Sequence, residues 1–143
     1  MSVSRIIDDK NFDVSSEIMD FIRRNSGGRS GAILFFVGVV REDSQIGKKV
    51  VELEIETYRE MADEELKKIS EEIRKEYDLQ DVQILHAEGK FSPGDFLVLV
   101  ALSAKSRKNV FPAMVKAIEA YKSRPPVFKK EVYLDGTSSW IQE

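Results

Sequence analysis

The segment Gly31–Arg41, with the sequence GAILFFVGVVR, is apolar at nearly every position. A strand with one face in water alternates apolar and polar residues, so an uninterrupted apolar run of strand length needs cover on both faces. We therefore expect a central strand of a sheet, with other elements packed over it. Arg41 then lies at the end of that strand.

A second kind of strand is predicted at Val50–Tyr58. Val51, Leu53 and Ile55 alternate with glutamates, which indicates one buried face and one solvent-facing acidic face. The remaining periodic segments and punctuating residues predict strands at Arg5–Asp8, Val82–Phe91, Asp95–Lys105 and Val127–Leu134, a helix that begins after an N-cap at Asp13 and ends near Asn25, helices at Met61–Tyr77 and Lys108–Lys122, and a C-terminal tail at Gly136–Glu143.

The expected order is β-α-β-β-α-β-β-α-β, which predicts an α+β fold. We expect a mixed, mainly antiparallel sheet with helices packed on it, similar to an α/β hammerhead. The chain has 143 residues, and this length predicts a single domain over residues 1–143. Pro112 is expected in the first turn of the last helix, and the prolines after Arg124 are expected to end it.

Composition excludes several classes of chemistry. Without cysteine the chain has no disulfide, no thiolate metal site and no cysteine nucleophile, and its one histidine argues against a metal site built from several histidines. We expect no metal and no cofactor. A net charge of −3 argues against broad nucleic-acid binding, and the absence of a long apolar run argues against a membrane span. A cytoplasmic protein is expected.

Four cations cluster in the segment AYKSRPPVFKKE of this otherwise acidic chain: Lys122, Arg124, Lys129 and Lys130. One interpretation is a solvated patch that offsets the dipole at a helix C-terminus. The other is a site, because a double proline turns the chain back at once and could bring the lysine of the helix close to those of the strand. Composition alone leaves both open.

The spacing of the last helix favours a site. Val115, Ile118 and Lys122 are three and four residues apart, so the lysine is expected to continue an apolar stripe, with its amine either extended outward to solvent or partly desolvated. A desolvated lysine can act as a nucleophile or general base. Lys129 and Glu131 are expected to share one face of the next strand, with Lys130 on the other face.

Other candidates lie at the ends of predicted elements. Arg41 could cap a sheet edge or bind a ligand, and Lys105 with Arg107 at a helix N-terminus suits an anion. Together these cations indicate a small anionic, phosphorylated substrate. His86 is expected to be a packed structural histidine, and Trp140 could be a packing anchor or a partner contact.

Four stretches of the chain resemble the large, catalytic subunit of molybdopterin synthase. They are GAILFFVGVVR, HAEGKFSPGD, VALSAKSRKNVFPA and AYKSRPPVFKKE, in family order from about Gly31 to Glu131. The resemblance implies an enzyme of molybdenum cofactor biosynthesis, a sulfurtransferase that converts cyclic pyranopterin monophosphate into the molybdopterin dithiolene. It implies that sulfur arrives as the C-terminal thiocarboxylate of a small ubiquitin-like subunit with a Gly-Gly tail. It also implies a homodimer of the large subunit within a heterotetramer.

The resemblance also assigns residues. It implies that Lys122 and Lys129 are the essential lysines, and that Arg41 and Arg107 contact the phosphate and the pterin. The remaining substrate-binding positions that it implies are Phe36, Val39, Val40, Ser106, Lys130 and Glu131. Val39 and Val40 fit the family pattern only through their backbones, and Ser106 stands where the family often has a histidine, so what takes the place of that histidine is open.

Two other functions stay open. The chain could be a non-catalytic module that binds a ubiquitin-like partner, which the serine at position 106 favours. It could also be a phosphate-ester or acyl-phosphate enzyme that uses the same cations. Such an enzyme works alone, whereas a synthase subunit is inert without its thiocarboxylated partner.

Overall fold

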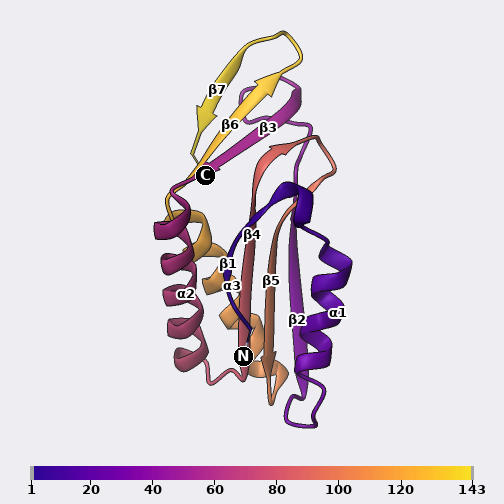
Figure 1. Cartoon of the computed structure of the whole chain (residues 1–143), viewed down its shortest axis with the longest axis vertical. Coiled ribbons are helices and arrows are strands. Elements are labelled where there is room, and N and C mark those ends of the chain that lie inside the picture. The colour runs from indigo at the N-terminus through magenta and orange to yellow at the C-terminus, as the bar shows by residue number, and fades with distance from the viewer. Residues whose placement is uncertain (1, 143) are drawn as a thin grey trace.

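A mixed sheet runs the length of the molecule, and three helices pack on it (Figure 1). The structure is a computed structural model that describes residues 2–142. Its elements in chain order are β1 (Arg5–Asp8), the 3₁₀ turn η1 (Asp9–Asn11), α1 (Val14–Arg24), β2 (Ala32–Val39), β3 (Val50–Thr57), α2 (Arg59–Glu76), β4 (Asp81–Phe91), β5 (Phe96–Ala104), α3 (Arg107–Ser123), β6 (Val127–Tyr133) and β7 (Ser138–Ile141).

The strands lie in the order β2-β5-β4-β3-β6-β7, and every neighbouring pair in this order is antiparallel. β1 adds to β4 as a parallel strand. α3 packs on β2 and β5, α2 packs on β1, β4 and α3, and α1 packs on β5. The predicted α+β fold with a mainly antiparallel mixed sheet is therefore confirmed.

β4 belongs to two parts of the sheet. Its residues Asp81–His86 pair with β5, whereas Gly89–Phe91 pair with β3. Gly89, the first residue of the second part, has a φ of 130°, and a Cβ there would lie 2.5 Å from the carboxyl carbon of Asp9. The strand therefore changes partners at a residue that only glycine suits. Beyond Gly89, β3, β6 and β7 form the upper end of the molecule in Figure 1, and we call these three strands the upper sheet.

β2 is an edge strand, so the expectation of a central strand is wrong. Its apolar character has another cause: Phe35 on one face meets Phe21 of α1 edge-on, with ring centroids 5.7 Å apart, while Phe36 on the other face packs against the main core. Helices on both faces make a strand apolar whether or not both of its edges are paired. Within residues 2–142, β5 is the one strand that pairs with β2.

Two details of the upper sheet also differ from the prediction. The register of β3 against β6 shifts between Val50 and Glu52, which buries Val50 and leaves Val51 42% exposed. Ser138–Ile141, expected within a tail, forms β7 and pairs with β6. A short polar segment of this kind has too little alternation to predict a strand, and pairing with β6 stabilises it.

Local chemistry fixes the ends of the helices. Asp13 caps α1 by accepting a hydrogen bond from the Ser16 backbone N–H at 3.2 Å, as expected. Pro112 was expected in the first turn of α3. The helix begins at Arg107, so Pro112 lies beyond the first turn, inside the helix. The helix ends at Ser123, with Arg124 as its C-cap, before the two prolines.

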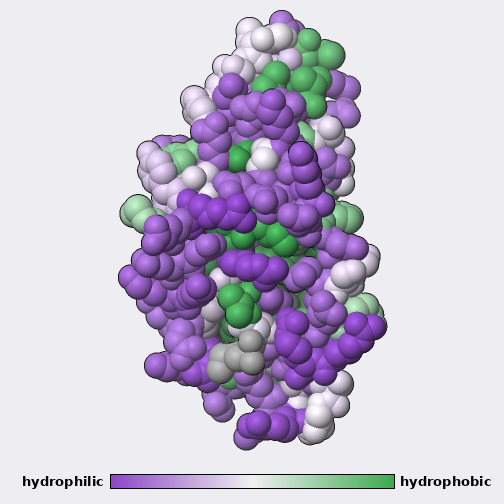
Figure 2. All heavy atoms as spheres, in the orientation of Figure 1, coloured by the Kyte–Doolittle hydropathy of each residue, from purple (hydrophilic) through white to green (hydrophobic). Residues whose placement is uncertain are grey.

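The surface of the view in Figure 2 is mostly hydrophilic, with hydrophobic residues gathered over the upper end and along the middle. Among residues 2–142, none of the helices is both long and apolar enough to span a membrane.

Candidate functional site

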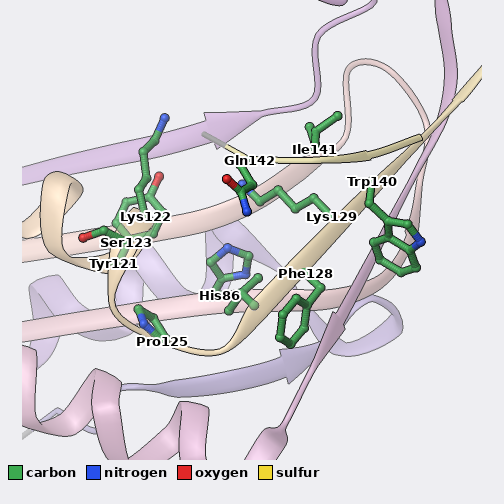
Figure 3. Close-up of a pocket in the computed structure, with 11 residues that line it drawn as sticks. His86, Tyr121, Lys122, Ser123, Pro125, Phe128, Lys129, Trp140, Ile141 and Gln142 are labelled. Carbon is green, nitrogen blue, oxygen red and sulfur yellow. The ribbon is translucent and has the colours of Figure 1, made fainter. Parts of the chain in front are cut away.

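A cavity of about 570 Å³ lies between the end of α3 and the strands β6 and β7. We call it the lysine cavity, because Lys122 and Lys129 both line it (Figure 3). Its lining comprises His86, Tyr121, Lys122, Ser123, Pro125, Val127, Phe128, Lys129, Trp140, Ile141 and Gln142. The helix-end lysine and the strand lysine therefore converge on one hollow, which is the geometry expected from the double proline.

The turn between α3 and β6 is held by backbone hydrogen bonds. The Val127 N–H donates to the Pro125 carbonyl at 2.8 Å, and the Tyr58 N–H donates to the Pro126 carbonyl at 3.2 Å. Proline cannot continue the helix and fixes its own φ, so the reversal is built into the sequence. These bonds tie both lysines to the start of α2.

Arg124 anchors the end of α3 from the side of α2 and does not line the lysine cavity. Its guanidinium lies 2.6 Å from a carboxylate oxygen of Glu72 and 2.7 Å from one of Glu65. The hydrogen bond to Arg124 holds the pKa of Glu72 below its usual range, and the same bond raises the pKa of Arg124. One of the four clustered cations is therefore structural.

Lys122 is exposed and does not continue the buried stripe of α3, so of the two expected placements of its amine the outward one is found. Val115 is also exposed, at 59%, although it was expected in the apolar stripe. The side chains that α3 buries are Val110, Ala113, Met114, Ala117 and Tyr121. The small alanines let the helix lie close to the sheet, which a search for large apolar residues overlooks. In Figure 3 the Lys122 side chain extends away from the His86 ring.

Strand pairing places the three polar residues of β6. Lys129 stands opposite Ile141 and Glu131 opposite Ser139, so both residues share a face, as predicted. Glu131 accepts a hydrogen bond from the Tyr133 hydroxyl at 2.8 Å. Lys130 lies on the other face, 3.5 Å from Glu54 and over the ring of Trp140, its Nζ 5.8 Å from the ring centroid.

His86 lies in the lining of the lysine cavity and is almost fully buried, with 1% of its surface exposed. Its Nδ1 lies 2.9 Å from the Ala87 carbonyl, which can only accept, so Nδ1 carries the proton in this bond. Its ring meets that of Tyr121 edge-on, with centroids 5.8 Å apart. The expected packed histidine is found, and it also forms part of the site.

Arg41 lines a second cavity of about 300 Å³, together with Val39 and Glu131. We call it the arginine cavity. Trp140, Ile141 and Gln142 belong to the linings of both cavities, so the two adjoin along β7. Arg41 and Lys129 thus lie on neighbouring hollows at the same end of the molecule.

The backbone of Val40 joins the end of β2 to the turn before β5. Its N–H donates to the Asp95 carbonyl and its carbonyl accepts from the Gly94 N–H, both at 2.9 Å. The Val40 side chain is buried, whereas that of Val39 is half-exposed. Phe36 packs against the core. These contacts fix the direction in which Arg41 leaves the strand.

Ser106 and Arg107 lie at the opposite end of α3 from Lys122. Ser106 is the N-cap of the helix and accepts a hydrogen bond from the Lys108 N–H at 3.2 Å. At a rise of about 1.5 Å per residue, the helix separates Arg107 from Lys122 by roughly 22 Å. Within one chain, the structure therefore does not bring this pair to the lysine cavity.

Sequence reasoning missed several lining residues. Tyr121 and Phe128 were not proposed, and Ile141 and Gln142 were assigned to a tail. The available signal was that both aromatic residues stand next to a lysine of the cationic segment. For the residues around β7 no local signal exists, because β6 draws them to the site.

The family model for the "MoaE protein" matches residues 7–124 of the chain. The molybdopterin synthase catalytic subunit of Bos taurus is 37% identical over 110 residues, which cover 77% of this chain and 58% of that protein. The corresponding subunit of Pyrococcus abyssi is 37% identical over 117 residues, which cover 82% of this chain and 78% of that protein. The chain spans just over half the length of the bovine and rat relatives that it matches.

A solved structure of the same fold is the X-ray crystal structure of molybdopterin synthase from Staphylococcus aureus. It aligns with a TM-score of 0.87 and 30% identity, over 100% of this chain and 99% of that one. The match includes β7, which the sequence had not predicted.

Proposed function

Because the chain belongs to the MoaE protein family, we propose that it is the catalytic subunit of a molybdopterin synthase. It transfers sulfur from the C-terminal thiocarboxylate of a small ubiquitin-like partner to cyclic pyranopterin monophosphate, and the product is the dithiolene of molybdopterin. A cytoplasmic location is part of this proposal.

One observation carries the proposal: Lys122 and Lys129 line a single cavity that is open to solvent and large enough for a small substrate. Two ammonium groups at one hollow attract an anion, such as a phosphate or a thiocarboxylate. The chain has no cysteine, so sulfur has to be brought by another molecule. A partner tail that ends in a thiocarboxylate supplies both the sulfur and the negative charge.

Binding and catalysis are assigned to different residues in this proposal. Lys129 and Arg41 hold the phosphate and the pterin at the two adjoining cavities. Lys122 assists when the thiocarboxylate sulfur attacks the substrate carbon: a carbon–sulfur bond forms as a carbon–oxygen bond at that carbon breaks, and the Lys122 ammonium gives its proton to the leaving oxygen. Water then breaks the acyl–sulfur bond and returns the tail as a carboxylate, and a second thiocarboxylated partner supplies the second sulfur of the dithiolene in the same way. Because the partner brings the nucleophile, the chain contributes mainly positioning and electrostatic stabilisation.

A second copy of the chain completes the site in this proposal. Arg107 has a role in substrate binding only if it comes from another molecule, because α3 holds it far from Lys122 in its own chain. The outer edge of β2 is one place where two copies could pair. Antiparallel pairing of two β2 strands brings the Ala32 end of one, where α3 begins, to the Val39 end of the other, where Arg41 lies.

A reconstituted assay tests the function. The chain is mixed with the thiocarboxylated small protein and cyclic pyranopterin monophosphate, and dithiolene product is measured. Product that depends on the thiocarboxylate supports the synthase. Tight partner binding without product favours the non-catalytic module, and phosphate release by the chain alone favours a phosphate-ester enzyme.

A further inference from the structure

Three exposed aromatic side chains gather on the outer face of the upper sheet. Tyr58 is 63% exposed, Phe128 45% and Trp140 56%, and the rings of the first two meet edge-on with centroids 5.4 Å apart. With Glu56 and Thr57 they line a hollow of about 260 Å³, which we call the aromatic hollow. Large aromatics exposed together in this way are typical of binding surfaces.

The aromatic hollow is continuous with the lysine cavity. Phe128 and Trp140 line both, and Figure 3 shows the two rings at one side of the lysine cavity, Phe128 on β6 beside Lys129 and Trp140 on β7. Lys130 lies over the Trp140 ring and is itself held near Glu54, so the indole has a fixed neighbour. The aromatic hollow and the lysine cavity therefore share the wall that Phe128 and Trp140 form.

The aromatic hollow and the lysine cavity differ in chemistry. The hollow is aromatic, whereas the cavity carries Lys122 and Lys129. A peptide with an apolar side chain followed by a negatively charged C-terminus matches both. A pair of glycines between them would span roughly 7 Å in an extended backbone.

We propose that the aromatic hollow docks the partner's tail by holding an apolar side chain just upstream of its C-terminal anion. The inference rests on the proposed function, because it takes the tail of that partner as the occupant. It goes further by assigning the affinity for the tail to Tyr58, Phe128 and Trp140, outside the lysine cavity.

Trp140 makes the test direct, because it is the chain's one tryptophan. The probe is a synthetic hexapeptide ending in Leu-Gly-Gly with a free carboxylate and without tryptophan or tyrosine. We expect its binding to shift the Trp140 emission to shorter wavelength in a saturable manner. We also expect weaker binding of a peptide ending in Asp-Gly-Gly and of the Leu-Gly-Gly peptide with an amidated C-terminus.

Tyr58→Ala is the decisive variant, since Tyr58 lines the hollow and is not part of the lysine-cavity lining. We expect the peptide Kd to rise by about tenfold, as for an aromatic contact at the centre of an interface. Leu134→Ala is the matched control: this apolar residue lies just beyond β6 and is 72% exposed, outside the hollow. Its Kd should equal that of the wild type.

An unchanged Kd in Tyr58→Ala, or saturable peptide binding without a change in Trp140 emission, overturns the inference. So does a Tyr58→Ala effect on the oligomeric state or on pterin binding with the peptide Kd unchanged. Turnover with the thiocarboxylated partner separates the two proposals. Product formation combined with an unchanged peptide Kd removes the docking role and leaves the synthase, whereas a wild-type chain without turnover removes the synthase and leaves the peptide titration to decide the hollow.

Discussion

Lys122 ends a helix and Lys129 lies in the strand that follows, yet both side chains line the same cavity. The double proline between them reverses the chain, and Arg124 fixes the helix end by its contacts with Glu65 and Glu72. Two cations that would repel each other in isolation are therefore held at one hollow by covalent and ionic constraints on either side. A pair of cations at one hollow attracts an anionic ligand.

Replacing Lys122 by alanine should remove turnover while the fold stays intact. In the proposed mechanism this amine acts on the reacting atoms, so we expect kcat of the reconstituted synthase to fall by about a hundredfold or more. The side chain is exposed, so the free energy of unfolding should change by less than about 0.5 kcal/mol.

Lys116→Ala is the control for this variant. Lys116 lies on the same helix, is exposed and pairs with Glu76 at 3.0 Å, away from the cavity. Its kcat should match that of the wild type. Wild-type turnover in Lys122→Ala would refute the role of Lys122.

Mixing two inactive variants tests whether Arg107 acts on a second copy. We expect Arg107→Ala and Lys122→Ala to be inactive alone. After unfolding and refolding together, half of the dimers contain one chain of each kind, and each of these has one intact site. About a quarter of wild-type activity should therefore return if a two-fold dimer shares the site.

An inactive mixture that nonetheless forms mixed dimers would show that Arg107 does not complete the partner's site. Full activity of Arg107→Ala alone would remove this residue from the site. Native mass spectrometry of differently tagged chains measures the fraction of mixed dimers.

The hairpin between β6 and β7 should have an acid-sensitive turn. The Thr137 hydroxyl and backbone N–H donate to Asp135, and Lys48 lies 3.1 Å away, which lowers the pKa of Asp135 from 3.8 to about 2. Because the pKa is lower in the folded state, this stabilisation is fully present above about pH 3.8 and is lost as the pH falls through about 2.

Carboxyl carbon NMR titration measures this directly. The Asp135 midpoint should be about 2 in the wild type and should rise towards 3.8 in Thr137→Val, which lacks the hydroxyl donor. A midpoint that stays at about 2 in the variant would assign the effect to the Thr137 backbone N–H and to Lys48.

Gly31→Ala should destabilise the protein, because β2 begins against the backbone of the strand beside it. A Cβ at this position would lie 2.1 Å from the Lys105 carbonyl oxygen, so the backbones must move apart. We expect a loss of about 2 kcal/mol in the free energy of unfolding, measured by urea denaturation. Gly27→Ala should change it by less than about 0.5 kcal/mol, since a Cβ there meets nothing within 4 Å. Equal values for the two variants would contradict this account.

Most elements of the fold could be predicted from local patterns. The alternation around Leu53 and the N-cap at Asp13 each depend on neighbours in the chain, and the structure confirms both. β7 depends on β6 instead, and the position of β2 depends on what its other edge meets. Neither the pairing of β7 nor the edge position of β2 can be predicted from a short stretch of neighbouring residues.

In the candidate site, too, local features could be predicted and features that depend on tertiary packing could not. The turn at Pro125 predicted that two lysines converge, because proline acts on the backbone beside it. The burial of α3 was misjudged because the helix buries the small residues Ala113 and Ala117 completely, whereas Val115 is exposed. Helical spacing gives the length between Arg107 and Lys122, but not which end of the helix faces the cavity. The roles of the proposed site residues remain predictions.

The change of partners along β4 has a mechanical consequence. Because one continuous strand pairs with both halves of the sheet, neither half can be pulled away without losing strand hydrogen bonds along β4. Melting should thus be a single cooperative event. Access to the lysine cavity should then depend on movements of side chains or of the hairpin between β6 and β7, and not on a hinge motion between the two halves of the sheet.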